Sequence, residues 1–179
     1  MPATLCQSCA HKKEIVSGRG SRFWMCELHR TDRRFAKYPP QPVARCEGHA
    51  EKDPLPSLEL HRETMSVCRL EPGEPLPPWA RGEPLFVART AEELSVVCVE
   101  EHVPAGITAE RGWRCLRVAG VLDFGQVGVI ASLTAPLADA GVSVFVVSSY
   151  DTDYLLVRGP DLPRAVEVLE RAGHPVVPR

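Results

Sequence analysis

The amino-acid sequence predicts an α+β fold, and the pattern of its C-terminal third decides this class. An apolar run at residues 115–118 leads through a turn into a segment with helical spacing, which is followed by a β-branched run at residues 142–149. A polar turn then precedes a further apolar run, residues 154–157, and an amphipathic helix at residues 161–173. With residues 175–177 as a closing strand, this order predicts a ferredoxin-like βαββαβ unit, in which two helices cover one face of an antiparallel sheet.

The same region contains one long, uninterrupted run of informative residues, LDFGQVGVIASLTAPLADAGVSVFVVSSYDTDYLLV (residues 122–157). It closely resembles the ACT domain, a small amino-acid-binding regulatory module, in the subtype related to the CASTOR arginine sensors and to small bacterial tandem-ACT proteins. Two upstream segments, EELSVVCVEEHVP and ERGWRCLRVAG, resemble the same subtype. The resemblance therefore extends over residues 58–174 and implies an ACT domain at residues 113–179.

Residues 58–112 contain strand patterns but no long helix. Strands are predicted at residues 58–70, 85–89 and 94–99, and Thr90 is expected to cap a single helical turn before the third strand. Five prolines between the first two strands forbid a regular hydrogen-bonded ladder there. This part of the chain is expected to be a reduced ACT-like half that pairs with the complete unit.

The turn at residues 122–128 has the chemistry of an amino-acid site. It precedes a helix whose first backbone N–H groups lie at the positive end of the helix dipole, which suits a carboxylate. Gly125 and Gly128 let a ligand approach the backbone, and Gln126 offers an amide. The carboxylate of Asp123 could cap the helix or meet an α-ammonium group, and both roles stay open.

The helix after this turn places Ile130, Leu133 and Leu137 at core spacing, and Pro136 is expected to bend it. ACT domains typically bind amino acids at this turn, commonly at an interface between two ACT units, so the resemblance also implies a homodimer. Position by position, it implies that the ligand is bound by Asp123, Phe124, Gln126, Val127, Gly128, Val129, Ile130, Ser148, Ser149, Tyr150, Thr152 and Asp153.

The cysteines divide into two groups. Cys68, Cys98 and Cys115 each stand alone in an apolar strand, where cysteine behaves as a small hydrophobe. The other four fall in the first 46 residues, as a C-x2-C pair and two C-x2-H pairs. This spacing predicts a small zinc-ribbon-like, cysteine-rich metal-binding head at residues 1–50. The metal ligands we expect are the four thiolates Cys6, Cys9, Cys26 and Cys46, with His29 and His49 as substitutes.

Zinc is the metal that we expect, in a structural role, because a head of this size cannot bury its own core. An iron–sulfur cluster, which also takes four thiolates, stays open as the alternative. A thioredoxin-like redox site is disfavoured, because only five residues precede Cys6 and no strand leads into the C-x2-C pair. A resemblance to short bacterial proteins, with a similar KYPPQPV run and no histidine at the two C-x2-H positions, favours the all-cysteine set.

The net charge of −2 conceals an asymmetry along the 179 residues. Residues 1–50 hold nine Lys or Arg against four Asp or Glu, whereas residues 51–179 hold twelve against nineteen. The basic head is expected to be a solvated surface around a metal module, while a protein target or a nucleic-acid surface are the alternatives. The Pro-rich run at residues 51–57 predicts a semi-rigid linker behind the head.

No catalytic constellation is recognisable, since His61, His102 and His174 are scattered singly and no nucleophile or phosphate-loop motif is present. No apolar run approaches the roughly 20 residues of a membrane span, and the first residues lack the layout of a secretory signal. We therefore expect a cytoplasmic, non-enzymatic regulator that binds an amino acid or similar small ligand. The alternatives are a metal- or redox-responsive protein with an ACT-like dimerisation scaffold, and a nucleic-acid-binding head under ligand control.

Overall fold

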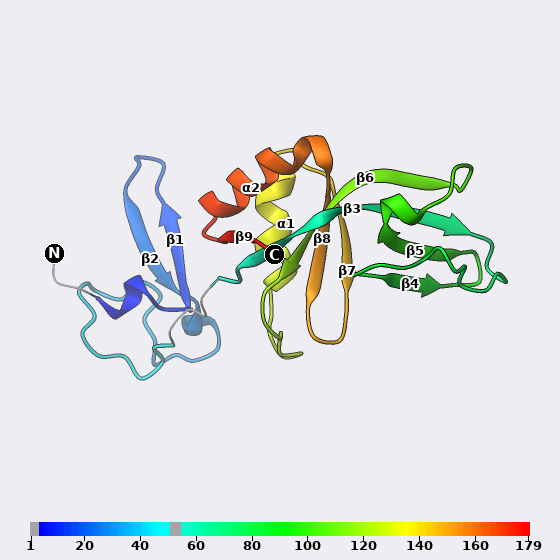
Figure 1. Ribbon diagram of the computed structural model, residues 1–179. Helices are drawn as coiled ribbons and strands as arrows, with labels where there is room; N and C mark the ends of the chain where they lie inside the picture. Colours follow the sequence, from blue (N-terminus) through cyan, green and yellow to red (C-terminus); the bar gives the residue numbers. More distant parts are fainter. Residues whose placement is uncertain (1–3, 51–54) are drawn as a thin grey trace. The chain divides into compact units, whose positions relative to one another are not determined.

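The chain folds into two units, each with its own β-sheet (Figure 1). The structure is a computed structural model that describes residues 4–50 and 55–179. The first unit is Met1–Pro54 and the second is Leu55–Arg179. Of the predicted linker, residues 51–54 lie outside the described residues.

The N-terminal unit is built on one hairpin, β1 (Lys12–Val16) and β2 (Arg22–Cys26), with the 3₁₀ turns η1 (Leu5–Gln7) and η2 (Glu27–Arg30). The segment SGRGSRFWMC predicts a glycine turn and a short strand through Phe23 and Met25, which is β2. β1 was not predicted, because KKEIV carries only two apolar residues in five. Met25 is the one buried apolar side chain among the described residues of this unit. The unit therefore has almost no apolar core.

The C-terminal unit contains one seven-stranded sheet and two helices, as the α+β prediction requires. Along the sheet the strands follow the order β4-β5-β3-β6-β8-β7, and β9 pairs with β3. Two 3₁₀ turns, η3 (Glu100–His102) and η4 (Gly159–Asp161), precede β6 and α2. The elements are β3 (Leu58–Leu70), β4 (Phe86–Arg89), β5 (Leu94–Val99), β6 (Ala109–Val118), α1 (Val129–Asp139), β7 (Val144–Ser148), β8 (Asp153–Arg158), α2 (Leu162–Arg171) and β9 (Val176–Pro178).

The closing strand pairs across the two expected halves of this unit. β9 runs parallel to β3, with Leu58 opposite Val176 and Leu60 opposite Pro178. β3 in turn pairs with β6 on its other side, so it lies between the first and last strands of the βαββαβ unit. The predicted boundary between residues 112 and 113 falls inside β6, and the two halves share one continuous sheet.

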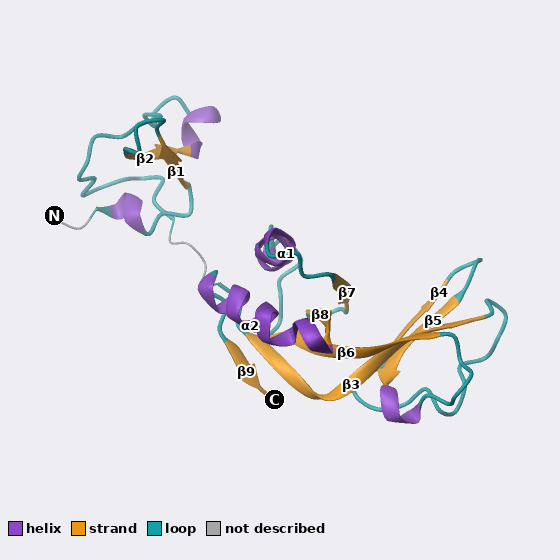
Figure 2. Cartoon of the chain, turned by 90° about the horizontal axis from the view of Figure 1, so that it is seen from above, coloured by secondary structure: helices purple, strands orange, loops and turns teal. Residues whose placement is uncertain are grey.

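Helices α1 and α2 cover one face of the sheet near β9, and Figure 2 shows β3 and β6 continuing from there to the end that carries β4 and β5. The opposite face also buries apolar side chains, including Met65 and Leu156. The sheet coils enough to bring the rings of Phe86 on β4 and Tyr154 on β8 within 4.7 Å of each other. The core under the helices consists of Leu58, Leu116, Val118, Leu133, Leu137, Val142, Leu155, Val157, Ala165 and Leu169.

The predicted helical turn at Thr90 is wrong. Arg89 and Leu94 pair across β4 and β5, and the Thr90 N–H donates to the carbonyl oxygen of Glu93 at 2.9 Å. The Thr90 hydroxyl oxygen accepts from the backbone N–H groups of Glu92 and Glu93, both at 3.1 Å. The cap that the sequence indicated therefore closes a hairpin turn.

The prediction for the three isolated cysteines is confirmed, because Cys68, Cys98 and Cys115 are all buried in strands.

Candidate functional site

The loop before α1 is held by its own backbone and by the neighbouring hairpin. The Leu122 N–H donates to the carbonyl oxygen of Asp151 at 2.8 Å, which ties the loop to the β7–β8 turn. One carboxylate oxygen of Asp123 accepts from the Gly125 N–H at 2.7 Å. Asp123 therefore closes a local turn inside the loop, and the alternative that it caps the helix is wrong.

The helix cap is Gly128, which adopts a left-handed conformation with φ of 85°. Glycine takes this conformation without the cost that a Cβ would add. It also supplies no side chain to accept from the first N–H groups of α1. These donors point out of the helix end, where the partial positive charge of the helix dipole lies. The N-terminus of α1 therefore offers donors to a carboxylate.

The β7–β8 hairpin forms the other wall. The Ser149 N–H and hydroxyl both donate to the carbonyl oxygen of Thr152, at 2.9 and 2.8 Å. The Thr152 hydroxyl, which is buried, donates to the carbonyl oxygen of Val118 at 2.7 Å. The Ser148 hydroxyl donates to the Asp153 carboxylate at 2.5 Å. Several hydroxyls of this wall are thus already engaged within the fold.

Loop, helix end and hairpin together line an open cleft of about 640 Å³. Every ligand residue that the resemblance implied lines it except Val127, whose side chain is 97% exposed and lies outside the lining. The lining also includes four residues that were not predicted as ligand contacts: Leu122, Ala131, Thr134 and Asp151. The spacing of these residues did not indicate that they line a cleft. Whether their side chains reach the cleft depends on how the loop, the hairpin and α1 fold.

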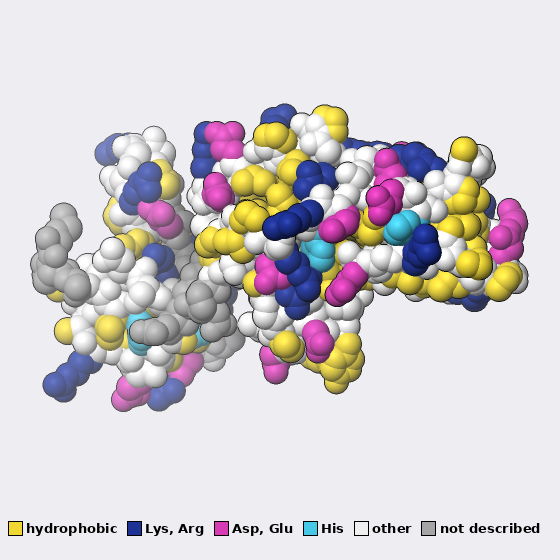
Figure 3. Space-filling view, in the orientation of Figure 1, with side chains coloured by type: hydrophobic (Ala, Val, Ile, Leu, Met, Phe, Trp, Pro, Cys, Tyr) yellow, Lys and Arg dark blue, Asp and Glu magenta, His cyan; other side chains and the backbone are white. Residues whose placement is uncertain are grey.

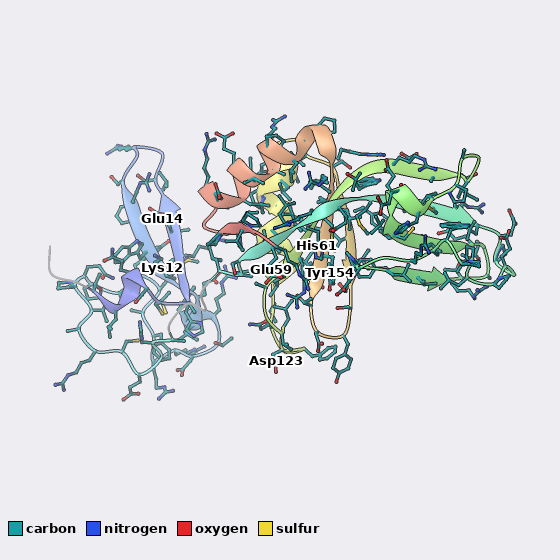
Figure 4. The ribbon with its side chains drawn as sticks, in the orientation of Figure 1. Lys12, Glu14, Glu59, His61, Asp123 and Tyr154 are labelled. Carbon is teal, nitrogen blue, oxygen red and sulfur yellow. The ribbon has the colours of Figure 1, made fainter. Side chains whose placement is uncertain are left out.

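The charged side chains that line the cleft are all negative. Asp123, Asp151 and Asp153 line it, and within the described residues no Lys, Arg or His does. Figure 3 shows hydrophobic and acidic side chains at the end of the unit where the loop and hairpin lie, and Figure 4 labels Asp123 there. A cleft that is lined by both backbone N–H donors and carboxylates suits a zwitterion.

Two aromatic side chains stand at the mouth of the cleft. Phe124 from the loop is 79% exposed and Tyr150 from the hairpin is 82% exposed. Their rings meet edge to face, with centroids 5.1 Å apart. Val121 and Val127 on the same loop are also largely exposed. Large apolar side chains that gather on a surface are typical of an interaction site.

A polar cluster lies away from the cleft, on β3 and β6 and at Arg179, which follows β9. His61 is 4% exposed, and its Nε2 atom lies 3.2 Å from Nη1 of Arg179. Burial, with the charge of Arg179, lowers the pKa of His61. Glu59 pairs with Arg117 at 3.1 Å beside it, and Figure 4 labels Glu59 and His61. This cluster was not predicted, because His61 stands alone among the histidines of the sequence. Its spacing of two residues from Glu59 nevertheless places both side chains on one face of the strand.

In the N-terminal unit, the four cysteines Cys6, Cys9, Cys26 and Cys46 line one small apolar cavity of about 60 Å³ together with His49. His29 is not in that lining, and its Nδ1 atom lies 2.5 Å from the carbonyl oxygen of Cys26. In residues 4–50 and 55–179, no group of three or more His, Cys, Asp or Glu side chains is arranged to hold a metal ion. The predicted metal centre therefore stays a prediction.

No helix among the described residues has both the length and the apolar character needed to cross a membrane.

Family models match two adjacent segments of the C-terminal unit. The ACT domain model matches residues 108–171. A second family model, which describes an N-terminal domain, matches residues 63–106. The first match covers β6 to α2, without the closing strand β9, and the second covers most of β3 together with β4 and β5.

Curated relatives include the cytosolic arginine sensor for mTORC1 subunit 1 of Homo sapiens and of Bos taurus. Each is 35% identical to this chain over 60 residues, which is 33% of this chain and 18% of the relative. The chain thus covers less than a fifth of the length of these relatives.

Solved structures resemble the C-terminal unit more completely. Protein Atu0741 from Agrobacterium tumefaciens is 34% identical, with a TM-score of 0.66, over 70% of this chain and 95% of that one. VC0802 from Vibrio cholerae, 22% identical, has a TM-score of 0.57 over 67% and 91% of the two chains. Aspartokinase III from E. coli shares only the fold, at 13% identity and a TM-score of 0.50 over 70% of this chain and 35% of that one. Residues 108–171 of the unit Leu55–Arg179 therefore match the ACT domain family.

Proposed function

We propose that this chain is a non-catalytic regulatory protein whose ACT domain binds a free amino acid in the cleft between α1 and the β7–β8 hairpin. The observation that carries the proposal is that helix N–H donors and carboxylates line the same cleft. Uncapped N–H groups at Gly128 and the start of α1 suit an α-carboxylate, and Asp123 on the loop or Asp153 on the hairpin suits an α-ammonium group. The named relatives, which are arginine sensors, support an amino-acid ligand and a cytoplasmic location.

The charge of the cleft favours an amino acid with a cationic side chain. The zwitterionic part of a ligand uses one carboxylate, yet three line the cleft. A guanidinium or ammonium group on the ligand side chain would meet the remaining ones and gain charge-assisted hydrogen bonds. An acidic amino acid would instead meet like charge. We therefore rank arginine and lysine ahead of neutral and acidic amino acids as ligands.

The first experiment is calorimetric titration of the full chain with arginine, lysine, citrulline, leucine and glutamate, checked by thermal shift. A ligand at 100 times its Kd stabilises the folded state by about 2.7 kcal/mol, which raises the melting temperature by several degrees. Arginine or lysine is expected to bind, citrulline, the neutral analogue of arginine, more weakly, and glutamate least. Failure of all five to bind would contradict the proposal.

Two glycine variants locate the site. Gly128 and Gly141 both have positive φ, 85° and 70°, and a Cβ at either would meet no atom within 4 Å. Gly128→Leu and Gly141→Leu therefore impose similar backbone strain, but only the first puts a side chain into the cleft. Gly128→Leu is expected to abolish binding while Gly141→Leu retains it. Equal affinities would place the ligand elsewhere.

Two charge reversals test the preference for a cation. Asp151 lines the cleft and Asp139 lies at the far end of α1, and both are exposed. Asp151→Lys is expected to weaken binding of arginine at least tenfold and that of leucine less, whereas Asp139→Lys, with the same change in net charge, leaves both affinities unchanged. If arginine affinity were insensitive to Asp151→Lys, the role given to the carboxylates would be wrong.

We also propose that the protein is a homodimer that buries the exposed apolar side chains of the loop and hairpin. Phe124, Val127 and Tyr150 support this surface, since side chains of this size are seldom left in water together. Light scattering of Phe124→Asp should then report a monomer where the unmodified chain reports a dimer. A monomeric unmodified chain would contradict this part of the proposal.

A second candidate function concerns the N-terminal unit, for which we propose a structural zinc site formed by Cys6, Cys9, Cys26 and Cys46. The support is that all four thiols line one cavity in a unit with a single buried apolar side chain. Units this poor in core usually depend on a metal or a disulfide. His49 lines the same cavity and is the substitute ligand, and an iron–sulfur cluster is the alternative occupant.

Elemental analysis of the purified chain tests this second candidate. About one zinc per chain is expected, with no visible absorption, and Cys46→Ser should lose the metal while His29→Ala keeps it. Visible absorption with bound iron would favour the cluster. Metal content that is unchanged in Cys46→Ser would show that the ligand set is wrong.

A further inference from the structure

The N-terminal unit has a second cleft, which shares Trp24 and Pro39 with the cavity of the cysteines and which neither proposed function uses. It is open, has a volume of about 780 Å³, and combines aromatic rings with prolines, amides and one arginine. It is lined by Thr4, Gln7, Arg22, Phe23, Trp24, Tyr38, Pro39, Gln41 and Pro42. We call this the aromatic cleft.

Two rings of the aromatic cleft are open to solvent. Phe23 is 50% exposed and Tyr38 is 52% exposed, in a unit whose one buried apolar side chain, among the residues described, is Met25. An aromatic ring that served the stability of this unit would be expected beside Met25. Rings that are exposed in a cleft are instead available to stack against a flat partner.

One wall of the aromatic cleft is fixed by hydrogen bonds. The Thr4 hydroxyl donates to the Gln41 side-chain oxygen at 2.6 Å and accepts from the Val43 N–H at 2.9 Å. The Gln41 side-chain nitrogen donates to the carbonyl oxygen of Pro39 at 3.0 Å. The wall beside Tyr38 is therefore held in place before any partner binds.

Positive charge surrounds the rings. Nζ of Lys12 lies 5.3 Å from the centre of the Trp24 ring, and Nζ of Lys37 lies 5.4 Å from the centre of the Tyr38 ring. The Arg22 side chain is 73% exposed and pairs with Glu14 at 3.0 Å, and Figure 4 labels Lys12 and Glu14 on β1. No acidic side chain lines the cleft in the described part of the unit. The cleft therefore complements a polyanion that carries flat rings.

We propose that the aromatic cleft binds single-stranded nucleic acid. Unpaired bases would stack on Tyr38 and Phe23, and the phosphates between them would lie near Arg22, Lys12 and Lys37. Aromatic platforms inside a basic groove bind single strands in this way with little sequence preference, because every base presents a π-face. Clefts rich in aromatic residues also bind proline-rich peptides, but such peptides lack the negative charge that this cleft complements.

The test is fluorescence anisotropy of labelled 20-nucleotide oligo(dT) and oligo(rU) with the full chain at several salt concentrations. Binding should weaken steeply as salt rises, since phosphate contacts release counterions. Tyr38→Ala and Phe23→Ala should each weaken it roughly tenfold or more, while Tyr38→Phe, which keeps the ring, retains it. Leu76→Ala, which removes an exposed apolar side chain from the other unit, should have no effect.

A pair of charge variants separates the cleft from general attraction to a basic surface. Neither Lys37 nor Lys13 lines the cleft itself, but Lys37→Gln removes a charge beside the Tyr38 ring, whereas Lys13→Gln removes one from another exposed lysine of the unit. Lys37→Gln should weaken binding several-fold more than Lys13→Gln. Equal losses together with an unaffected Tyr38→Ala would mean non-specific attraction, and would overturn the proposal. So would binding of a proline-rich peptide without binding of either oligonucleotide.

Discussion

His174 reaches the backbone of Ser132, with its Nε2 atom 3.2 Å from the Ser132 carbonyl oxygen. In an α-helix that carbonyl would accept from the N–H group four residues later, which here is Pro136 and has none. The other ring nitrogen of His174 lies 3.0 Å from the carbonyl oxygen of Pro56. The histidine is 1% exposed, so it joins the residues before β3 to the point in α1 that the proline leaves without a donor.

A double-mutant cycle tests this relationship. His174→Phe keeps a ring of similar size but removes both nitrogens, and it is expected to lower the free energy of unfolding by about 1–3 kcal/mol. Pro136→Ala restores an N–H group to the Ser132 carbonyl. The cost of His174→Phe should therefore be smaller in the Pro136→Ala background, as measured by urea denaturation. An identical cost in both backgrounds would mean that His174 does not act through this carbonyl.

The fold class followed from periodicity wherever one face of an element is buried. β3 and β5 lie where they were predicted, because Leu58 and Leu94 are fully buried and their neighbours are less so. β8 was predicted as an apolar run, of which Leu155 and Leu156 are both fully buried, and α2 from its helical spacing. The pairing of β9 with β3 was not predictable in this way. Several strands of the unit are apolar enough to be the partner of β9. Only the packing of the whole sheet determines which of them it pairs with.

Local chemistry was harder to assign than periodicity. Asp123 was placed in the correct turn, yet its carboxylate bonds to Gly125 two residues later and not to a helix end. Thr90 likewise accepts the bonds of a cap within a hairpin. The side-chain oxygen of a short polar residue accepts a hydrogen bond from whichever backbone N–H group lies nearest. The sequence does not show whether that group belongs to a helix end or to a turn. The turn at residues 122–128 was predictable from its glycines and its place before a helix, whereas the hairpin wall was implied by the resemblance to the ACT domain.

His61 should make stability depend on pH. Because burial and Arg179 lower the pKa of His61 below its ordinary value of 6.5, the unfolded chain takes up a proton at a higher pH than the folded one. The free energy of unfolding should therefore fall as the pH drops through about 6.5. Glu59 and Glu63 act in the opposite direction without reversing the shift. Urea denaturation between pH 5 and pH 8 should give a smaller slope for His61→Gln, and an unchanged slope would contradict this assignment.

Cys115 should resist alkylation in the folded chain. Its side chain is fully buried between β3 and β8, and burial raises the pKa of the Cys115 thiol from 9.0 to about 12. At pH 8 the thiolate population would then be lower by about a thousandfold. Iodoacetamide labelling followed by peptide mass spectrometry should find Cys115 unmodified in native buffer and modified in urea. Rapid labelling in native buffer would mean that this part of the sheet opens readily.

Thr152 separates a structural role from a ligand contact. Although it lines the cleft, its hydroxyl donates to the buried carbonyl oxygen of Val118. Thr152→Val keeps the side-chain volume and removes this donor, so it should lower the free energy of unfolding by about 1–2 kcal/mol. Because the hydroxyl is already used, the variant should bind arginine with unchanged affinity at a temperature where it remains folded.

Ser148→Ala provides the comparison, since the Ser148 hydroxyl bonds to the Asp153 carboxylate at the cleft wall. Freeing that carboxylate should change arginine affinity with little loss of stability. If Thr152→Val instead weakened binding and left stability intact, the hydroxyl would be a ligand contact, and its bond to Val118 would have to exchange when the ligand enters.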